Sequence, residues 1–522
     1  MPSPNEAPSD AAAERERPDP LELPGVRSDS DALDVEVLIV GAGISGIGTG
    51  IELLRRKQRS FMLLEAAGDL GGTWRDNTYP GVAVDIPSIS YCFSFETDYK
   101  WSRVFAPGSE IQDYVRHCAA KYGVEPHIRY GAAVEHCEFD ASKDIWSTTL
   151  AGGTVLRSRF VVAATGILCQ PKYPDVEGLD SFAGKMMHTA RWDHDFELEG
   201  KRVGIIGTGA SAVQIVPAIA KRVSNLEVFQ RTPIWVSKRP DYKLDHSGVT
   251  PRNSAAGRAT MRFFTELFFE VGTYFITTYK RWPWLVGGVE KRLGDRIRAV
   301  VDDPEVADKL VPSYGMGCKR PAISNSYLQS FNRDDVQLVT EGIERVCPEG
   351  VITRDGKLHA LDAILLATGF LTTERKASPS FDVVGLDGLE LSQFWEDNRL
   401  QAYAGVSVPR FPNFFLTSGP YSGGFNWFAM LEAHLLHIMQ CMDAARSKGV
   451  TRVEVEQATH DRYMAHMWKR SDIAVFKDDK CVAANSYYLD RHGDASLPFP
   501  RTPFWRWVRV RAKGASGYHF GS

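Results

Sequence analysis

Two glycine-rich turns constrain the fold of this 522-residue chain more than any other feature. Each lies between a short apolar run and a helical pattern, which is the context that a dinucleotide-binding unit requires. The characteristic positions are Gly41, Gly43 and Gly46 in the first turn and Gly207, Gly209 and Ala212 in the second. Small residues at this spacing permit a tight turn, a close approach of backbone to pyrophosphate, and close packing of helix on sheet. The sequence therefore predicts an α/β fold with two Rossmann-like dinucleotide-binding domains.

The first unit has the features of an FAD site. The apolar run after its helix ends in Glu65, near the spacing of about 20 residues at which an acid accepts hydrogen bonds from ribose hydroxyls. Gly72 and Thr73 follow, and they supply backbone N–H groups and a small side chain beside a flavin's phosphates and ring. A glycine turn without a ligand is the alternative, but three features agree on a nucleotide.

The second unit differs at the corresponding strand end. There the chain carries Arg231 and Thr232 in place of an acid. A carboxylate would repel a 2′-phosphate, whereas a guanidinium can bind it through two hydrogen bonds. The sequence therefore predicts NADPH in this unit, and a surface arginine at a strand end is the alternative. Two such cofactors indicate hydride transfer from NADPH to FAD, with oxygen as the favoured final acceptor.

Composition and cysteine spacing disfavour other classes. The chain is 43% hydrophobic and 24% charged with a net charge of −4, which indicates no nucleic-acid partner. None of the eight cysteines forms C-x-x-C, so disulfide reductases and zinc ribbons are disfavoured, and free cysteines suit a reducing compartment. The first 34 residues have no basic region followed by an apolar one, so we expect no signal peptide. No run reaches the ~18 apolar residues of a membrane helix. We expect a cytoplasmic protein, and the sequence does not favour membrane association.

Two longer motifs accompany the glycine turns. One has the form F-x-G-x-x-x-H-x-x-x-W-D and comprises Phe182, Gly184, His188, Trp192 and Asp193. The other has the form G-x-W-x-x-x-x-Y-P-G-x-x-x-D and comprises Gly72, Trp74, Tyr79, Pro80, Gly81 and Asp85. With both motifs and both turns in this order, the chain resembles the Baeyer–Villiger monooxygenases, a type of class B flavin-dependent monooxygenase, over residues 33–500.

The resemblance implies a reaction and roles for several residues. In that family an arginine in the segment matching YGMGCKRPAIS lies over the flavin, which implies this place for Arg320. Asp85 would orient Arg320, and Lys319 would join Arg231 at the 2′-phosphate. The implied reaction uses NADPH and O2 to convert a ketone into an ester or lactone through a flavin C4a-peroxide. A permanently charged guanidinium would stabilise that anion.

His188 is grouped with the catalytic residues as a hinge latch, whose hydrogen bonding changes as the domains rotate. Cofactor contacts are expected from Gly41, Gly43, Gly46, Glu65, Gly72, Thr73, Trp74, Asp85, Gly207, Gly209, Ala212, Arg231, Thr232 and Lys319. Tyr487 stands where many relatives carry a tryptophan near the nicotinamide, and the loop aromatics Tyr421, Phe425 and Trp427 are candidate pocket residues.

Two other functions remain open. One is oxygenation of sulfides or amines by a related flavin monooxygenase, and the other is an NADPH-dependent flavin reductase serving a partner protein. The expected domains are a disordered or surface-wrapping tail (1–30), an FAD-binding domain (31–175 and 361–522), an NADP-binding domain (176–240 and 311–360) and a helical insertion (241–310). The insertion is expected to pack as core and to form one wall of the substrate pocket. A membrane-surface helix, with flanking Arg and Lys, is the alternative.

Overall fold

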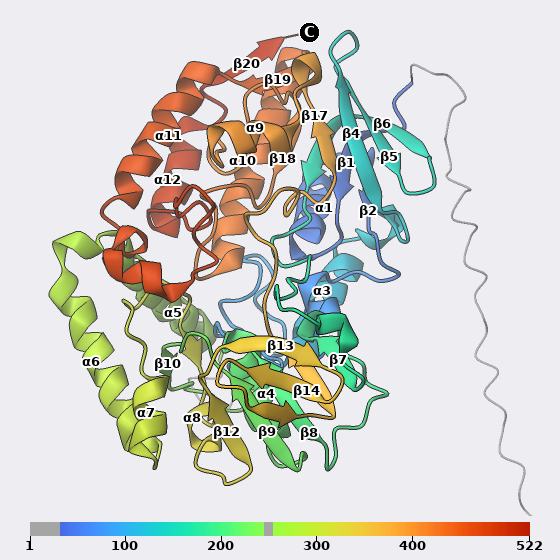
Figure 1. The fold of residues 1–522 in the computed structure, drawn as a ribbon. Coiled ribbons are helices and arrows are strands. Elements are labelled where there is room, and N and C mark those ends of the chain that lie inside the picture. Colours follow the sequence, from blue (N-terminus) through green and yellow to red (C-terminus); the bar gives the residue numbers. More distant parts are fainter. Residues whose placement is uncertain (1–31, 245–253, 522) are drawn as a thin grey trace, which may run out of the picture.

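The computed structural model describes residues 32–244 and 254–521, so the expected N-terminal tail lies outside the described residues. The first unit is built on a mixed sheet with strand order β17-β4-β5-β6-β1-β2-β3, and β18 pairs with β6 (Figure 1). Its strands are β1 (Val35–Val40), β2 (Phe61–Leu64), β3 (Ile128–Arg129), β4 (Val134–Asp140), β5 (Ile145–Leu150), β6 (Val155–Ala163), β17 (Asp382–Val384) and β18 (Phe414–Leu416).

Apolar runs explain the central strands of this sheet. The end of β1 is buried, and β1 pairs in parallel with both β2 and β6, as a strand covered on both faces does. Helices α1 (Ile44–Arg55), α3 (Gly108–Lys121) and α10 (Trp427–Lys448) contribute buried residues to the same core. The C-terminal part of the chain therefore completes the first unit.

The second unit contains a five-stranded parallel sheet with order β12-β9-β8-β16-β7. Its strands are β7 (Lys185–His188), β8 (Arg202–Ile206), β9 (Asn225–Phe229), β12 (Val336–Val339) and β16 (Ala363–Leu366), and helix α4 (Ala210–Ile219) follows the second glycine turn. Because β16 belongs to this sheet, the boundary expected at residue 361 is wrong: the second unit continues through this strand. The two-unit α/β fold itself is confirmed.

The expected insertion is helical in its described part, with α5 (Ala255–Thr277), α6 (Pro283–Val300) and α7 (Pro304–Leu310). It lies on the same side of the molecule as the C-terminal helices α11 (Gln457–Ser471) and α12 (Pro503–Lys513) (Figure 1). The smaller elements are α2 (Thr73–Asp76), α8 (Tyr327–Ser330), α9 (Leu391–Asn398), β10 (Val236–Ser237), β11 (Ala322–Ile323), β13 (Ile343–Cys347), β14 (Gly350–Thr353), β15 (Leu358–Ala360), β19 (Arg452–Val455) and β20 (Tyr518–Gly521). None of the helices described is long and apolar enough to cross a membrane.

The sequence Ala-Thr-Gly occurs after the central strand beside each glycine turn, and the structure gives a physical reason for it. Gly41 has φ +106°, and a Cβ there would lie 2.7 Å from the carbonyl oxygen of Ala164, which follows β6. Gly207 has φ +113°, and its Cβ would lie 2.4 Å from the carbonyl oxygen of Ala367, which follows β16. Each turn therefore packs its first glycine against the neighbouring strand end, and only glycine fits.

Candidate active site

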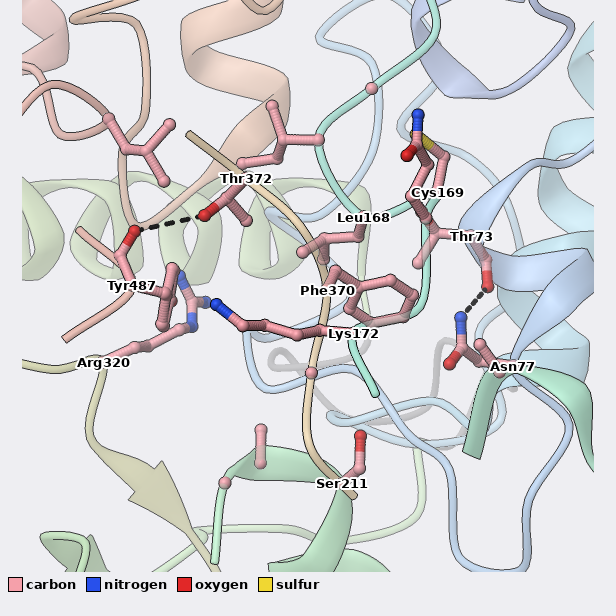
Figure 2. A pocket seen from close by; sticks show the side chains of 18 of the residues that line it. Thr73, Asn77, Leu168, Cys169, Lys172, Ser211, Arg320, Phe370, Thr372 and Tyr487 are labelled. Atoms are coloured by element: carbon pink, nitrogen blue, oxygen red, sulfur yellow. Dashed lines mark hydrogen bonds between the residues drawn. The ribbon is translucent and has the colours of Figure 1, made fainter. Parts of the chain in front are cut away.

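One large cavity of about 1890 Å³ reaches both glycine turns. Pockets for a single small ligand measure about 300–1,000 Å³, so this one has room for two dinucleotides. Predicted site residues in its wall are Gly41, Gly43, Glu65, Gly72, Thr73, Trp74, Asp85, Gly207, Gly209, Arg231, Thr232, Lys319 and Arg320. Arg320 and Tyr487 lie on one side of it, Thr73 and Asn77 on the other, and Ser211 of α4 below (Figure 2).

Arg320 and Asp85, both in this wall, form a two-point ion pair. Arg320 Nε donates to Asp85 Oδ2 at 2.6 Å, and Nη2 donates to Oδ1 at 2.7 Å and to the carbonyl of Phe425 at 3.2 Å. Burial acts to lower the pKa of Arg320, but the Asp85 carboxylate outweighs it, so this pKa is raised. The guanidinium is thus a fixed positive charge that still faces the cavity, with a quarter of its side chain exposed.

Glu65 is buried at the end of β2 and is tied to the first glycine turn. Its Oε2 accepts the backbone N–H of Ala42 at 2.8 Å, and its Oε1 accepts Arg75 Nη1 at 2.8 Å and the N–H of Ala67 at 3.0 Å. These bonds leave acceptor capacity on a carboxylate that lines the cavity beside the turn. The position and chemistry fit a ribose diol.

Lys319 and Arg231 form a cationic pair in the second unit. No carboxylate forms an ion pair with either side chain in the described parts of the chain, although both line the cavity. Burial and the charge of Arg231 lower the pKa of Lys319 to about 8. Two neighbouring cations without a counter-ion fit a dianionic phosphate, and therefore the 2′-phosphate of NADPH.

The lowered pKa predicts how NADPH binding depends on pH. Lys319 loses its proton as pH rises through about 8, and its attraction for a phosphate is lost with the charge. We expect the Kd of NADPH, measured by titration without oxygen, to rise above pH 8 by up to about tenfold per pH unit. The variant Lys319→Arg should bind NADPH with a flat profile over this range, because arginine keeps its charge. The same steep profile in this variant, or with NADH, would contradict the assignment.

Gly209 gives a test of close nucleotide approach that is separate from folding. Its φ is −71°, and a Cβ there would meet no atom of the protein within 4 Å. The variant Gly209→Ala should keep the Tm, yet raise the KM for NADPH by about tenfold or more, because the methyl group would collide with the pyrophosphate. Gly207→Ala is the contrasting variant, and it should lower the Tm. Unchanged KM in Gly209→Ala would show that the nucleotide does not approach this turn.

His188 lies outside the cavity wall, although Ala190 and Gly369, to which it is hydrogen-bonded, line it. The ring is buried at the end of β7; Nδ1 accepts the N–H of Ala190 at 3.1 Å, and Nε2 therefore donates to the carbonyl of Gly369 at 3.0 Å. Burial lowers its pKa, which favours this neutral form. His188 thus fixes the edge strand to the Ala-Thr-Gly turn after β16, and its role as a latch stays a prediction.

Gly46 and Ala212 also lie outside the cavity wall, since each faces the packing between helix and sheet. A Cβ on Gly46 would lie 1.9 Å from the carbonyl oxygen of Gly41, and Ala212 is fully buried. Among the aromatic candidates, Phe425, Trp427 and Tyr487 line the cavity, whereas Tyr421 is buried in the first core.

Sequence reasoning missed Gln214, which joins the two units. Its side chain on α4 accepts the hydroxyl of Tyr79 at 3.0 Å and donates to the carbonyl of Ala83 at 2.9 Å. It thus holds the loop that carries Asp85 against the second unit. A single glutamine in a helix carries no sequence signal for this contact, because its partners are distant in the chain.

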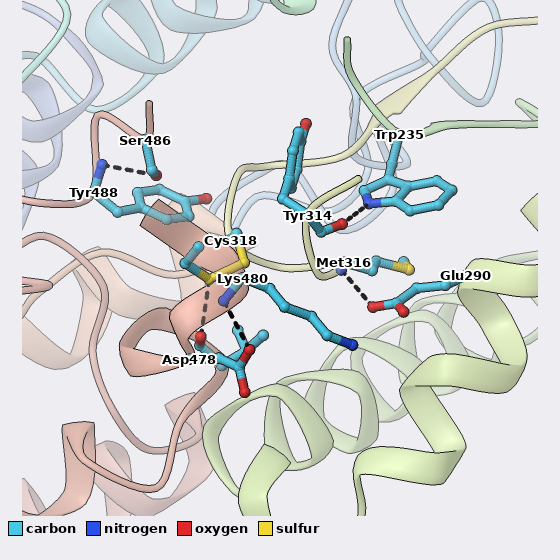
Figure 3. Close-up of a disulfide and its surroundings, with 11 residues drawn as sticks. Trp235, Glu290, Tyr314, Met316, Cys318, Asp478, Lys480, Ser486 and Tyr488 are labelled. Carbon is cyan, nitrogen blue, oxygen red and sulfur yellow. Dashed lines mark hydrogen bonds between the residues drawn. A yellow bond between two sulfur atoms is a disulfide. The ribbon is translucent and has the colours of Figure 1, made fainter. Parts of the chain in front are cut away.

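The expectation of free cysteines is wrong for two of the eight. Cys318 and Cys481 form a disulfide with a Cα–Cα distance of 5.1 Å (Figure 3). It ties the segment before Lys319 and Arg320 to the segment before Tyr487. The two cysteines are 163 residues apart, and the fold alone brings them together.

Comparisons with known proteins agree with this geometry. Residues 38–260 match the pyridine nucleotide-disulphide oxidoreductase family. A Baeyer–Villiger monooxygenase from Streptomyces coelicolor is 36% identical over 471 residues, or 90% of this chain and 89% of that protein. Another from Pseudomonas aeruginosa is 32% identical, over 93% and 91% of the two chains. This chain belongs to the Baeyer–Villiger monooxygenases. The predicted class, an FAD-dependent NADPH monooxygenase, is confirmed with it.

Solved structures of this family have the same fold. Cyclohexanone monooxygenase from Rhodococcus sp. Phi1, bound to NADP⁺, superposes with a TM-score of 0.83 at 26% identity, covering 94% of this chain and 99% of that one. An oxidized steroid monooxygenase bound to NADP gives a TM-score of 0.81 at 27% identity, covering 94% and 100%. This Baeyer–Villiger monooxygenase therefore retains the family architecture over nearly its whole length.

Proposed function

We propose that this protein uses NADPH and O2 to convert ketones into esters or lactones. The Arg320–Asp85 ion pair carries this proposal, because it fixes a positive charge in the wall of a cavity that reaches both nucleotide-binding turns. A reductase that only passes electrons to a partner needs no such charge. Family membership supports the same reaction class.

The chain's own residues divide the work between binding and charge stabilisation. The 2′-phosphate of NADPH would be held by Lys319 and Arg231, and the FAD ribose by Glu65. FAD held there would supply the electrons for oxygen activation after reduction by NADPH. Arg320 would stabilise negative charge that develops beside it, and Asp85 keeps the guanidinium oriented without removing its charge.

The substrate wall is formed by elements from three parts of the chain. The same cavity is lined by Thr273 and Ile276 of α5, Phe425 and Phe499. The Phe425 ring centroid lies 5.9 Å from the guanidinium of Arg320. This mainly apolar wall favours an apolar ketone with few polar groups. A cytoplasmic location is part of the same proposal.

Product analysis tests the proposal. The purified enzyme with NADPH and O2 should give esters or lactones from a panel of cyclic, linear and aryl ketones, with NADPH consumption accelerated by the accepted ketone. Matched sulfides provide the comparison. Products from sulfides alone would favour soft-nucleophile oxygenation, and rapid electron transfer to an added carrier without any oxygenated product would favour a reductase.

A further inference from the structure

Helix α5 exposes its large apolar side chains to solvent, the reverse of the usual pattern of a surface helix. Its exposed side carries six large apolar residues: Phe263, Phe264, Leu267, Phe268, Val271 and Tyr274. Phe268 is 73% exposed, Phe263 63% and Phe264 61%. A surface helix normally turns such residues toward the core. Exposed apolar residues that occur singly are common, but a continuous stripe of them marks an interaction site.

The charged side chains of α5 point toward the protein instead. Arg262 donates to the sulfur of Cys92 at 3.0 Å and pairs with Glu266 at 3.0 Å. Glu266 also accepts the hydroxyl of Ser90 at 3.2 Å. These contacts fix the rotation of the helix about its axis. The outward position of the aromatic residues is therefore set by bonds on the opposite side of α5.

Helix α12 continues this surface. It exposes Phe504, Trp507 and Val508, of which Phe504 is the most exposed at 62%. Its arginine Arg506 is buried and donates to His434 at 2.5 Å. The backbone N–H of Phe504 donates to Glu270 of α5 at 3.2 Å, so the two helices adjoin (Figure 1). The aromatic face is defined as Phe263, Phe264, Leu267, Phe268, Val271, Tyr274, Phe504, Trp507 and Val508.

Cations lie close to the aromatic face in the chain, and they form no ion pair with a carboxylate in the parts of the chain described. This basic rim comprises Lys280, Arg281, Arg470, Arg501, Arg511 and Lys513. The guanidinium of Arg511 lies 4.2 Å from the ring centroid of Trp507, so rim and face are in contact. Burial and the charge of Arg281 lower the pKa of Arg470, which places these two cations close together. The whole chain has a net charge of −4, so the excess of cations is local.

We propose that the aromatic face and basic rim dock peripherally on an anionic lipid surface. Aromatic and aliphatic side chains that enter the interfacial region, flanked by lysine and arginine at the headgroups, are what such binding requires. A second copy of the chain fits less well. A symmetric dimer through this face would bring two basic rims together, and like charges repel. Anionic headgroups would neutralise them.

Docking through the aromatic face would bring the substrate cavity close to the lipid. The helices that carry the aromatic face also line the cavity. The lining residues are Thr273, Ile276 and Thr277 of α5 and Pro503 of α12. Docking would place this wall at the membrane, where apolar molecules accumulate. This consequence rests on the proposed oxidation of apolar ketones, whereas the docking itself does not.

Vesicle co-sedimentation of the purified flavoprotein tests the inference. We expect binding to phosphatidylcholine vesicles that contain phosphatidylglycerol, weaker binding to phosphatidylcholine alone, and weakening with added salt. The double variant Phe264→Ser/Phe268→Ser should lower the partition coefficient by about tenfold or more, because two exposed rings no longer enter the bilayer. Lys280→Glu/Arg281→Glu should selectively reduce binding to the anionic vesicles.

The matched control is Val155→Ser/Leu358→Ser. It removes two exposed apolar side chains that lie in β6 and β15 and do not belong to the aromatic face. It should bind vesicles like the unmodified protein. NADPH oxidation and the Tm report that each variant is folded, and neither readout depends on the ketone reaction. If the protein binds neither the anionic vesicles nor those of phosphatidylcholine alone, the inference is overturned. A concentration-dependent dimer, abolished by Phe264→Ser/Phe268→Ser, in a protein that does not bind vesicles would also overturn it.

Discussion

Replacing Arg320 with alanine is expected to lower kcat for ester formation by about 100- to 1,000-fold, the usual effect of removing one donor that stabilises a developing anion. The cause is loss of a charge that two bonds to Asp85 hold in a fixed geometry at the cavity wall. NADPH should still bind through Lys319 and Arg231. The measurement is kcat for ester in parallel with FAD content and the rate of NADPH-dependent reduction without oxygen.

Two companion variants separate charge from packing. Arg320→Lys keeps a positive charge but cannot make both bonds to Asp85, so it should retain part of the activity. Asp85→Asn keeps the size of the side chain but loses the ion pair, and it should impair ester formation with Arg320 present. If Arg320→Ala formed ester at the full rate with normal FAD content, Arg320 would not take part in the reaction. Loss of FAD would instead make the pair structural.

The second large effect is expected in cofactor preference. The double variant Arg231→Ala/Lys319→Ala should lower kcat/KM for NADPH by about 100-fold or more, because two charge-assisted contacts to the 2′-phosphate are lost. The value for NADH should change little, since NADH carries no such phosphate. Steady-state kinetics with both cofactors provide the measurement.

Lys221→Ala is the matched control, because Lys221 is exposed in the second unit and does not line the cavity. This variant should keep the NADPH preference. An equal loss with NADPH and NADH in the double variant would mean that the two cations support the fold of the second unit and do not select its cofactor.

The nucleotide-binding elements could be predicted because they depend on local sequence. A glycine turn such as Gly41–Gly46 needs its strand and its helix within a few residues, and Glu65 follows at the end of the next strand. Repetition of the pattern at Gly207 then predicted two units. The pair Arg320–Asp85, in contrast, was expected only from resemblance to a family, since its members are distant in the chain.

Contacts between distant residues explain what was missed. The disulfide between Cys318 and Cys481 depends on the meeting of two loops, and no spacing rule predicts it. The strand ending at His188 forms because β16 offers an open edge, although the segment has no period of its own. The pattern of α5 predicts a helix, but the side that it exposes is set by bonds to Cys92 and Ser90.

The most direct test of the central claim is to follow oxygen atoms. The enzyme is given NADPH, an accepted ketone and isotopically labelled O2, and the ester is examined by mass spectrometry together with NADPH consumption. We predict that each ester molecule carries one labelled oxygen atom and that NADPH and ester are related one to one. Consumption of NADPH with hydrogen peroxide as the only oxygen product, across the whole ketone panel, would contradict the account.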